Sequence, residues 1–211
     1  MKGQRARRIV VVEPRHRRAY RQSGIARQGN RRVKERGTER VTLVVGGARS
    51  GKSRHAQRLA EQGASALVFV ATAQAFDAEM QDRIARHRAD RDDRWRTVEA
   101  PIRLAEAIAD ADAPAATILV DCLTLWTSNL LLGEEDVEQQ LLRLDETLRT
   151  VRARVVLVTN EVGWGIVPDN ALARRFRDAA GRLHQALAAE CDRVVLTVAG
   201  LPLVIKPQGT P

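Results

Sequence analysis

A glycine-rich stretch with one lysine and two serines, "GGARSGKS" at residues 46–53, has the residue types that bind phosphate. It fits the pattern G-x-x-x-x-G-K-[ST] and lies between an apolar run and an amphipathic segment, the strand–loop–helix context that this motif requires. Glycines let backbone N–H groups surround phosphate oxygens, and the following helix adds its positive N-terminal end. Against the alternative of a chance glycine-rich turn, the stretch predicts a nucleoside triphosphate site formed by Gly46, Gly47, Ala48, Arg49, Ser50, Gly51, Lys52 and Ser53.

Three residues are expected to have separate roles at this site: Lys52, Ser53 and Asp121. Lys52 would neutralise the β- and γ-phosphates, and the Ser53 hydroxyl would ligate Mg²⁺. Asp121 closes the apolar run "TILVD", which places it at the carboxyl end of a strand, where ligands bind in open α/β sheets. The alternative for Asp121 is a helix N-cap for the segment from Cys122, and Glu161, after the next strand, is a second candidate ligand. The sequence therefore predicts Mg²⁺ and a nucleotide, without a tightly bound organic cofactor.

The charged stretch "DRIARHRADR" at residues 82–91 holds one histidine among four arginines and two acids. On a helix, Arg83, His87 and Arg91 are spaced at i, i+4 and i+8 and share one face. Two guanidiniums beside an imidazole attract a triphosphate, stabilise charge on the attacked phosphorus and favour the neutral, nucleophilic imidazole. The pattern leaves two interpretations, a solvated helix face or a nucleophile for covalent catalysis.

Apolar runs that alternate with amphipathic segments indicate the elements that must position these residues. We expect strands at residues 41–45, 66–71, 117–121, 154–160, 193–199 and 201–206. We expect helices at residues 53–62, 77–88, 123–132, 136–152 and 170–190, with a further short helix after Pro101. Continuous apolar strands alternating with helices predict an α/β domain with a mostly parallel sheet covered by helices on both faces.

The net charge of +9 is concentrated at one end of the chain. Residues 1–40 carry 14 basic and 3 acidic side chains, a balance of +11, whereas the rest carries 21 basic and 23 acidic ones, a balance of −2. We expect residues 1–40 to be a basic, disordered extension to a single domain at 41–211. Three origins are open for this extension: a nucleic-acid-binding arm, a targeting segment, or translation from an upstream start that the working protein does not use. The abrupt onset of ordered sequence at Val41 favours the third. The near-neutral remainder argues against nucleic acid as a partner.

The length of the apolar runs and the two cysteines indicate in which cellular compartment the protein works. The longest apolar runs are too short to span a bilayer, and no signal peptide pattern opens the chain. The two cysteines, Cys122 and Cys191, are 69 positions apart without metal-ligand spacing, which is typical of buried, reduced thiols. These observations predict a cytoplasmic protein without a membrane span.

Several motifs beyond the phosphate loop resemble the bifunctional adenosylcobinamide kinase/adenosylcobinamide-phosphate guanylyltransferase family of cobalamin biosynthesis. The resemblance runs from about Val41 to Lys206 and leaves residues 1–40 outside it. It rests on "NEVGWGIVP", "RIARHRADR" and "NALARRFRDAAGRLHQALA", together with "GGARSGKSRHA", "VATAQAFDAEM" and "WRTVEAP". It implies a P-loop NTPase fold with a RecA-like sheet.

The resemblance implies two reactions. ATP or GTP phosphorylates the aminopropanol hydroxyl of adenosylcobinamide. GTP then gives GMP to His87, and the GMP passes to adenosylcobinamide phosphate to form adenosylcobinamide-GDP. Glu99 would accept hydrogen bonds from guanine N1 and N2, its alternative being a surface carboxylate. Besides the phosphate loop, the family's nucleotide-binding positions fall on Ala71, Thr72, Ala73, Arg88, Ala89, Asp90, Arg91, Glu99 and Asp121.

The resemblance also implies a homo-oligomer, specifically a ring-like trimer, that acts on a corrinoid. Trp164, in a glycine-flanked loop, would contact the corrinoid or a neighbouring subunit. His55 is either a phosphate-side contact or a structural residue, whereas His184 and His16 are expected to be passive. Two other functions stay open: a P-loop enzyme with only the kinase or only the guanylyltransferase activity, and a nucleic-acid-dependent ATPase that uses the basic extension.

Overall fold

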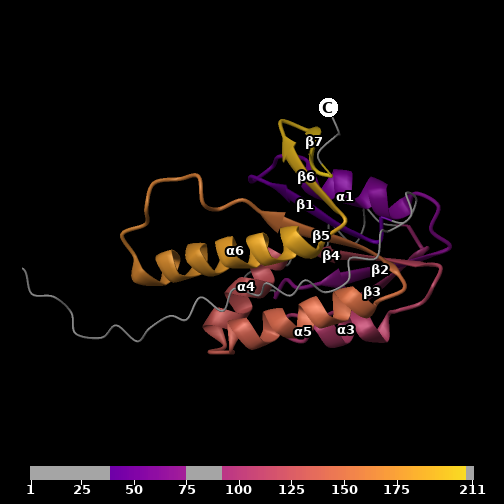
Figure 1. The fold of residues 1–211 in the computed structure, drawn as a ribbon, viewed down its shortest axis with the longest axis horizontal. Coiled ribbons are helices and arrows are strands. Elements are labelled where there is room, and N and C mark those ends of the chain that lie inside the picture. The colour runs from indigo at the N-terminus through magenta and orange to yellow at the C-terminus, as the bar shows by residue number, and fades with distance from the viewer. Residues whose placement is uncertain (1–38, 75–91, 208–211) are drawn as a thin grey trace, which may run out of the picture. The chain divides into compact units, whose positions relative to one another are not determined.

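The computed structural model describes residues 39–74 and 92–207, and the strands in this part of the chain form one sheet (Figure 1). They are β1 (Val41–Gly46), β2 (Ala66–Ala71), β3 (Trp95–Glu99), β4 (Ala116–Asp121), β5 (Arg154–Asn160), β6 (Arg193–Val198) and β7 (Leu201–Lys206). Their order across the sheet is β3-β2-β4-β5-β1-β6-β7. All neighbours pair in parallel except β7, which runs antiparallel to β6. The mostly parallel α/β sheet predicted from the sequence is confirmed.

The described helices cover both faces of this sheet. They are α1 (Lys52–Glu61), α3 (Leu104–Asp110), α4 (Leu123–Leu132), α5 (Val137–Thr150) and α6 (Ala171–Glu190). Ala56 and Leu59 of α1 pack on one face, whereas Leu104, Trp126 and Leu183 bring α3, α4 and α6 to the core on the other (Figure 1). The central strands are buried on both faces, which is why they read as continuous apolar runs. The helix expected at residues 77–88 lies outside the described residues.

The edge strand β3 is an element that the sequence analysis did not predict. Only Trp95 in it is buried, and its remaining residues are exposed or half-buried. An edge strand pairs on one side alone, so it lacks the continuous apolar run that marks the central strands. The indole of Trp95 makes an edge-to-face contact with Phe69 of β2, with ring centroids 6.4 Å apart.

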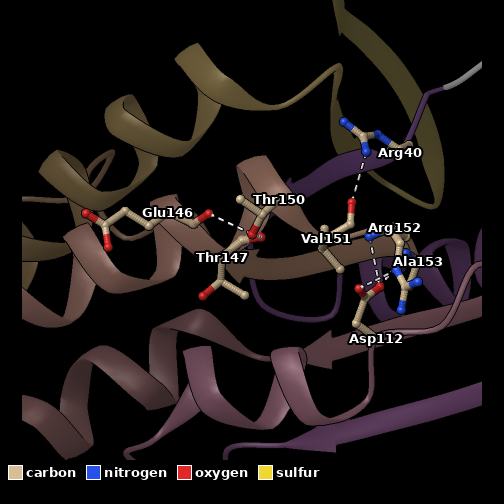
Figure 2. A network of polar contacts seen from close by, with 8 residues as sticks. All are labelled: Arg40, Asp112, Glu146, Thr147, Thr150, Val151, Arg152 and Ala153. Carbon is tan, nitrogen blue, oxygen red and sulfur yellow. Dashed lines mark hydrogen bonds and ion pairs between the residues drawn. The ribbon is translucent and has the colours of Figure 1, made fainter.

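A polar network ties together the loops at the amino ends of the strands (Figure 2). Asp112, which follows α3, accepts the backbone N–H groups of Arg152 and Ala153, each at 2.8 Å. Arg40 Nη1 donates to the Val151 carbonyl oxygen at 2.9 Å. Burial by itself raises the pKa of Asp112, but the hydrogen bonds from Ala153 and Arg152 outweigh it and hold that pKa below its ordinary value.

The first described residues belong to this same edge. Asp192 Oδ2 accepts the backbone N–H groups of Arg40 and Val41, each at 2.9 Å. Arg193 Nη1 donates to Glu39 Oε2 at 3.0 Å. Glu39 and Arg40 are therefore anchored to the sheet, whereas residues 1–38 lie outside the description.

The structure also bears on two expectations about the protein class. No helix within the described residues combines the length and apolar character that a bilayer crossing requires. Cys122 and Cys191 are both buried free thiols, as expected, and burial raises the pKa of Cys191 to about 12. The Cys191 thiol is thus protonated and unreactive at neutral pH.

Candidate functional site

The phosphate loop joins β1 to α1 at the carboxyl edge of the sheet. Gly51 is the N-cap of α1 with a φ of 90°, and Lys52 begins the helix. The Ser50 N–H and Lys52 Nζ both donate to the Gly47 carbonyl oxygen, each at 3.3 Å. The described first turn of α1 holds no acidic side chain, so no local carboxylate competes with an anion for its N–H groups. Strand, loop and helix are arranged as the phosphate-binding motif requires.

Close contacts require two glycines of this loop. A Cβ at Gly46 would overlap Ser50 Oγ and come 2.7 Å from the Thr197 carbonyl oxygen. At Gly51, where φ is positive, a Cβ would come 3.1 Å from Gly200 Cα. Gly200 lies between β6 and β7, and its N–H donates to the Ser50 carbonyl oxygen at 2.9 Å. The turn between β6 and β7 therefore braces the phosphate loop, a contact that the motif does not reveal.

Asp121 is half-buried at the carboxyl end of β4, and β5 lies between β4 and the phosphate-loop strand β1. The N-cap of α4 is Cys122, so the alternative of Asp121 as the helix cap is wrong. Thr72, after β2, joins the ends of β2 and β4. Its hydroxyl donates to the Cys122 oxygen at 2.7 Å and accepts the Cys122 N–H at 2.9 Å. The buried Thr72 hydroxyl is thus engaged within the protein, and Ala71 and Ala73 flank it half-buried.

Glu99 ends β3 beside an open pocket of about 560 Å³, a volume that suits a small-molecule ligand. The Glu99 side chain is exposed, and Arg96 and Arg103 also line the pocket. The chain after Glu99 is fixed by α4, because Trp126 Nε1 donates to the Ile102 carbonyl oxygen at 2.7 Å. The pocket can therefore offer both a carboxylate and guanidinium groups to a polar ligand.

A hydrogen-bonded network that the sequence analysis missed holds the end of β5. Thr124 Oγ1 accepts the Asn160 N–H at 2.6 Å and lies 3.2 Å from Thr159 Oγ1. His184 Nε2, from α6, lies 2.7 Å from the same Thr159 oxygen. Burial lowers the pKa of His184, an effect that the negative charge of Glu161 partly offsets. His184, which was expected to be passive, thus helps to hold the end of β5. This contact is visible only once α6 is seen to pack against β5.

The loop between β5 and α6 leaves the sheet beside the phosphate loop. The Glu161 N–H donates to the Gly46 carbonyl oxygen at 3.0 Å, and Glu161 Oε1 accepts the Gly163 N–H at 2.6 Å. Trp164 and Ile166 are 76% and 97% exposed. Such exposed apolar side chains are typical of a surface that contacts a ligand or another subunit.

Of the two histidines considered for the site, the structure describes His55 and not His87. His87 and the adjoining positions lie outside the described residues; these positions are Arg88, Ala89, Asp90 and Arg91. His55 lies in α1, where burial, and then the charges of Arg58 and Arg193, lower its pKa. Its Nε2 is buried and has no hydrogen-bond partner among the described residues. His55 is therefore neutral at pH 7.

Comparison with known proteins gives matches that cover most of this chain. A family model described as "Cobinamide kinase / cobinamide phosphate guanyltransferase" matches residues 42–205. The bifunctional adenosylcobalamin biosynthesis protein CobP of Pseudomonas aeruginosa is 50% identical over 168 residues, 78% of this chain and 96% of that protein. The bifunctional adenosylcobalamin biosynthesis protein CobU of Salmonella typhimurium is 45% identical over 181 residues, 79% of this chain and 99% of that protein.

Among solved structures, an ATPase from the type III secretion system of pathogenic bacteria has a TM-score of 0.48 and 11% sequence identity. The match covers 79% of this chain and 57% of that one.

Proposed function

The chain belongs to the cobinamide kinase / cobinamide phosphate guanyltransferase family, and from this premise we propose how its site serves two reactions. The protein is a bifunctional kinase and guanylyltransferase of adenosylcobalamin biosynthesis. In the first reaction a nucleoside triphosphate phosphorylates the side-chain hydroxyl of adenosylcobinamide. In the second, GMP from GTP is joined to that phosphate, and pyrophosphate leaves. The observation that carries the proposal is the phosphate loop, formed between β1 and α1 within the segment that the family model matches.

The phosphate loop is proposed to hold the triphosphate in both reactions. Backbone N–H groups of residues 46–53 surround the phosphates, and Lys52 neutralises charge that develops during transfer. Lys52 is half-buried and bonds only weakly, at 3.3 Å, to the Gly47 oxygen, so little is lost when its ammonium turns to a phosphate. Arg49, exposed at the tip of the loop, supplies a second cation.

The residues around the loop fit Mg²⁺. Ser53 offers a hydroxyl and Asp121 a carboxylate, and such hard oxygen donors are the ligands that Mg²⁺ prefers. The described residues contain no cluster of three or more His, Cys, Asp or Glu that would hold a metal alone. When bound, the ion would neutralise charge on the phosphates.

His87 is proposed as the nucleophile that accepts GMP. Its ring nitrogen forms a bond to the α-phosphorus of GTP while the bond to pyrophosphate breaks. The phosphate oxygen of adenosylcobinamide phosphate then attacks the same phosphorus and releases the histidine. Support comes from the sequence, which has Arg83 and Arg91 four residues before and after His87; on a helix these guanidiniums would favour the neutral imidazole and attract the triphosphate. Arg88, Ala89, Asp90 and Arg91 are proposed to bind the nucleotide beside it.

Glu99 is proposed to recognise guanine. A carboxylate accepts hydrogen bonds from both N1–H and N2–H of guanine, and adenine offers no such pair of donors. The exposed position of Glu99 on the rim of the 560 Å³ pocket supports this assignment. Ala71, Thr72 and Ala73, at the end of β2, are proposed to line the nucleotide site.

Three further proposals follow from the family resemblance. The protein acts in the cytoplasm, in keeping with its two buried free thiols. It assembles as a homo-oligomer, specifically a trimer, in keeping with the exposed Trp164 and Ile166. Its partners are the corrinoid and the nucleotides, without nucleic acid. Sedimentation of the purified protein tests the trimer.

The decisive experiment incubates the protein with Mg²⁺ and GTP labelled at the α-phosphate. We expect label on the protein in an acid-labile, base-stable bond, as a phosphoramidate requires, and none on the His87→Ala variant. His16→Ala is the matched control and should label normally. Label that survives in His87→Ala would overturn the histidine assignment, and adenosylcobinamide supplied with ATP then shows whether the kinase activity stands alone.

A further inference from the structure

A row of three residues crosses the sheet directly beneath the phosphate loop. Asn160 of β5 and Thr197 of β6 are the register partners of Gly46 on its two sides. Val44 and Val158, two residues earlier in β1 and β5, pack in the core cluster on the α1 face. Because side chains alternate along a strand, Asn160 and Thr197 also face α1 and the loop.

Three buried polar atoms on residues next to Gly46 in the loop and the sheet have no hydrogen-bond partner among the described residues. They are Ser50 Oγ, Thr197 Oγ1 and Asn160 Oδ1. Native proteins pair nearly all such atoms, so a cluster of them indicates a place kept for water or a ligand. Ser50 and Thr197 are 8% and 1% exposed and form the closed floor of the loop. Asn160 is half-buried as a residue, and its Oδ1 belongs to this buried set.

The position of Asn160 in the sheet relates it to the reacting groups. β5 lies between β1, which leads into the phosphate loop, and β4, which ends at Asp121. The Asn160 N–H is held by Thr124 Oγ1 at 2.6 Å, and Thr124 is linked through Thr159 to His184. The backbone that carries the carboxamide is therefore fixed, as a group that orients reactants requires.

We propose that Asn160 is a further catalytic residue of the kinase reaction, which orients the corrinoid hydroxyl against the terminal phosphoryl group. Its Nδ2 donates to an oxygen of the phosphoryl group, and its Oδ1 accepts the hydrogen bond of the attacking hydroxyl. In the step, the hydroxyl oxygen forms a bond to phosphorus, the bond to the nucleoside diphosphate breaks, and the hydroxyl proton passes to solvent. The carboxamide takes up no proton; it positions two groups that otherwise meet at random.

This inference rests on the proposed kinase function, and the test separates the two. Asn160→Ala removes both hydrogen bonds, so we expect kcat for adenosylcobinamide phosphorylation to fall about 100-fold while the nucleotide Kd stays within about threefold. The rate of GMP-adduct formation should stay within about threefold of wild type, because in that reaction the attack is on the α-phosphorus. Asn160→Asp keeps the shape and the acceptor but loses the donors and adds negative charge, so phosphorylation should fall further and the nucleotide should bind more weakly.

Gln139→Ala, which removes an exposed side-chain amide on α5, is the matched control and should leave both reactions unchanged. Full phosphorylation by both Asn160 variants overturns the inference while the kinase function stands. An equal loss of phosphorylation, adduct formation and nucleotide binding, together with a lowered Tm, also overturns it, because Asn160 would then act only as part of the floor. Wild-type protein that does not phosphorylate adenosylcobinamide overturns the kinase function and this inference with it.

Discussion

Two sets of polar residues, one at each edge of the sheet, differ in their hydrogen bonding. At the amino edge, Asp112 and Asp192 each accept two backbone N–H groups from neighbouring loops. At the carboxyl edge, Ser50, Asn160 and Thr197 each keep a buried polar atom without a partner among the described residues. An unpaired buried polar atom costs on the order of 1–3 kcal/mol, so the second arrangement is unfavourable in the absence of a ligand.

The difference separates the residues that hold the fold from those that act on substrates. A closed network at the amino edge fixes the loops and contributes to the free energy of unfolding. An open one beneath the phosphate loop leaves hydrogen-bonding capacity for what binds there. Substitutions at the two edges should therefore alter different measurements.

The largest effect should come from Lys52→Ala at the carboxyl edge. The loss of the ammonium that faces the phosphates should lower kcat/KM for adenosylcobinamide phosphorylation by about 1000-fold. The Tm should hardly move, because the hydrogen bond that Lys52 makes within the described part of the chain is a long one, 3.3 Å to the Gly47 oxygen. Activity and thermal unfolding are measured on the same preparation. A large drop in Tm would erase the contrast between the edges.

Gly46→Ala tests whether the open edge is also tightly packed. The added Cβ would overlap Ser50 Oγ and press on the Thr197 carbonyl oxygen, so we expect a loss of about 1–3 kcal/mol in the free energy of unfolding, together with weaker nucleotide binding. Denaturant unfolding and nucleotide titration measure the two losses. The matched control is Gly181→Ala in α6, where a Cβ meets nothing within 4 Å; it should stabilise the protein by about 0.5–1 kcal/mol. Similar losses in both variants would contradict the packing argument.

Asp112→Ala probes the amino edge. Two backbone N–H groups lose their acceptor, so the free energy of unfolding should fall by about 2 kcal/mol, while both activities stay at the wild-type level. The pKa of Asp112 is held below its ordinary 3.8, so its stabilisation is present above that pH and is lost as pH falls through the lowered pKa. When the free energy of unfolding is measured with denaturant between pH 7 and pH 3, it should fall less steeply with falling pH for the variant than for wild type. An impaired kinase step would mean that the edges are coupled.

The smallest effect concerns His184. Burial holds its pKa in the folded protein below 6.5, so the unfolded chain takes up the proton first and stability declines as pH falls from about 6.5 toward the lowered pKa. His184→Asn keeps a hydrogen-bonding group without this titration, so its free energy of unfolding should fall less than that of wild type between pH 7.5 and pH 5.5. His55, whose pKa burial also lowers, titrates in both proteins and serves as the internal reference. Identical pH slopes would rule out the buried His184 as their source.

Sequence reasoning found the parts of the site that depend on local order. The phosphate loop and Asp121 each follow directly on an apolar run, so a strand prediction places them at the carboxyl edge without knowledge of the sheet order. The strands and helices in the described residues were predicted for the same reason. The exception, β3, lies at the sheet edge and has only Trp95 buried, so its burial pattern is too weak to recognise.

The parts that sequence reasoning missed depend on register between distant segments. Asn160 and Thr197 become neighbours of Gly46 only because β5 and β6 flank β1. His184 meets Thr159 only because α6 packs on that side of β5. No spacing along the chain encodes these contacts, although a polar residue at the end of a buried strand, as in "VTN", is a usable signal.

The brace between Gly200 and Ser50 has a consequence for how the protein is made. The phosphate loop is synthesised early, but the backbone group that supports it, and the strand that supplies Thr197, emerge from the ribosome much later. A nascent chain that has completed β1 and α1 therefore still lacks the brace of the phosphate loop. The loop reaches the form described here once the β6–β7 hairpin has been synthesised, so the last strands of the sheet complete a site whose motif lies in the first.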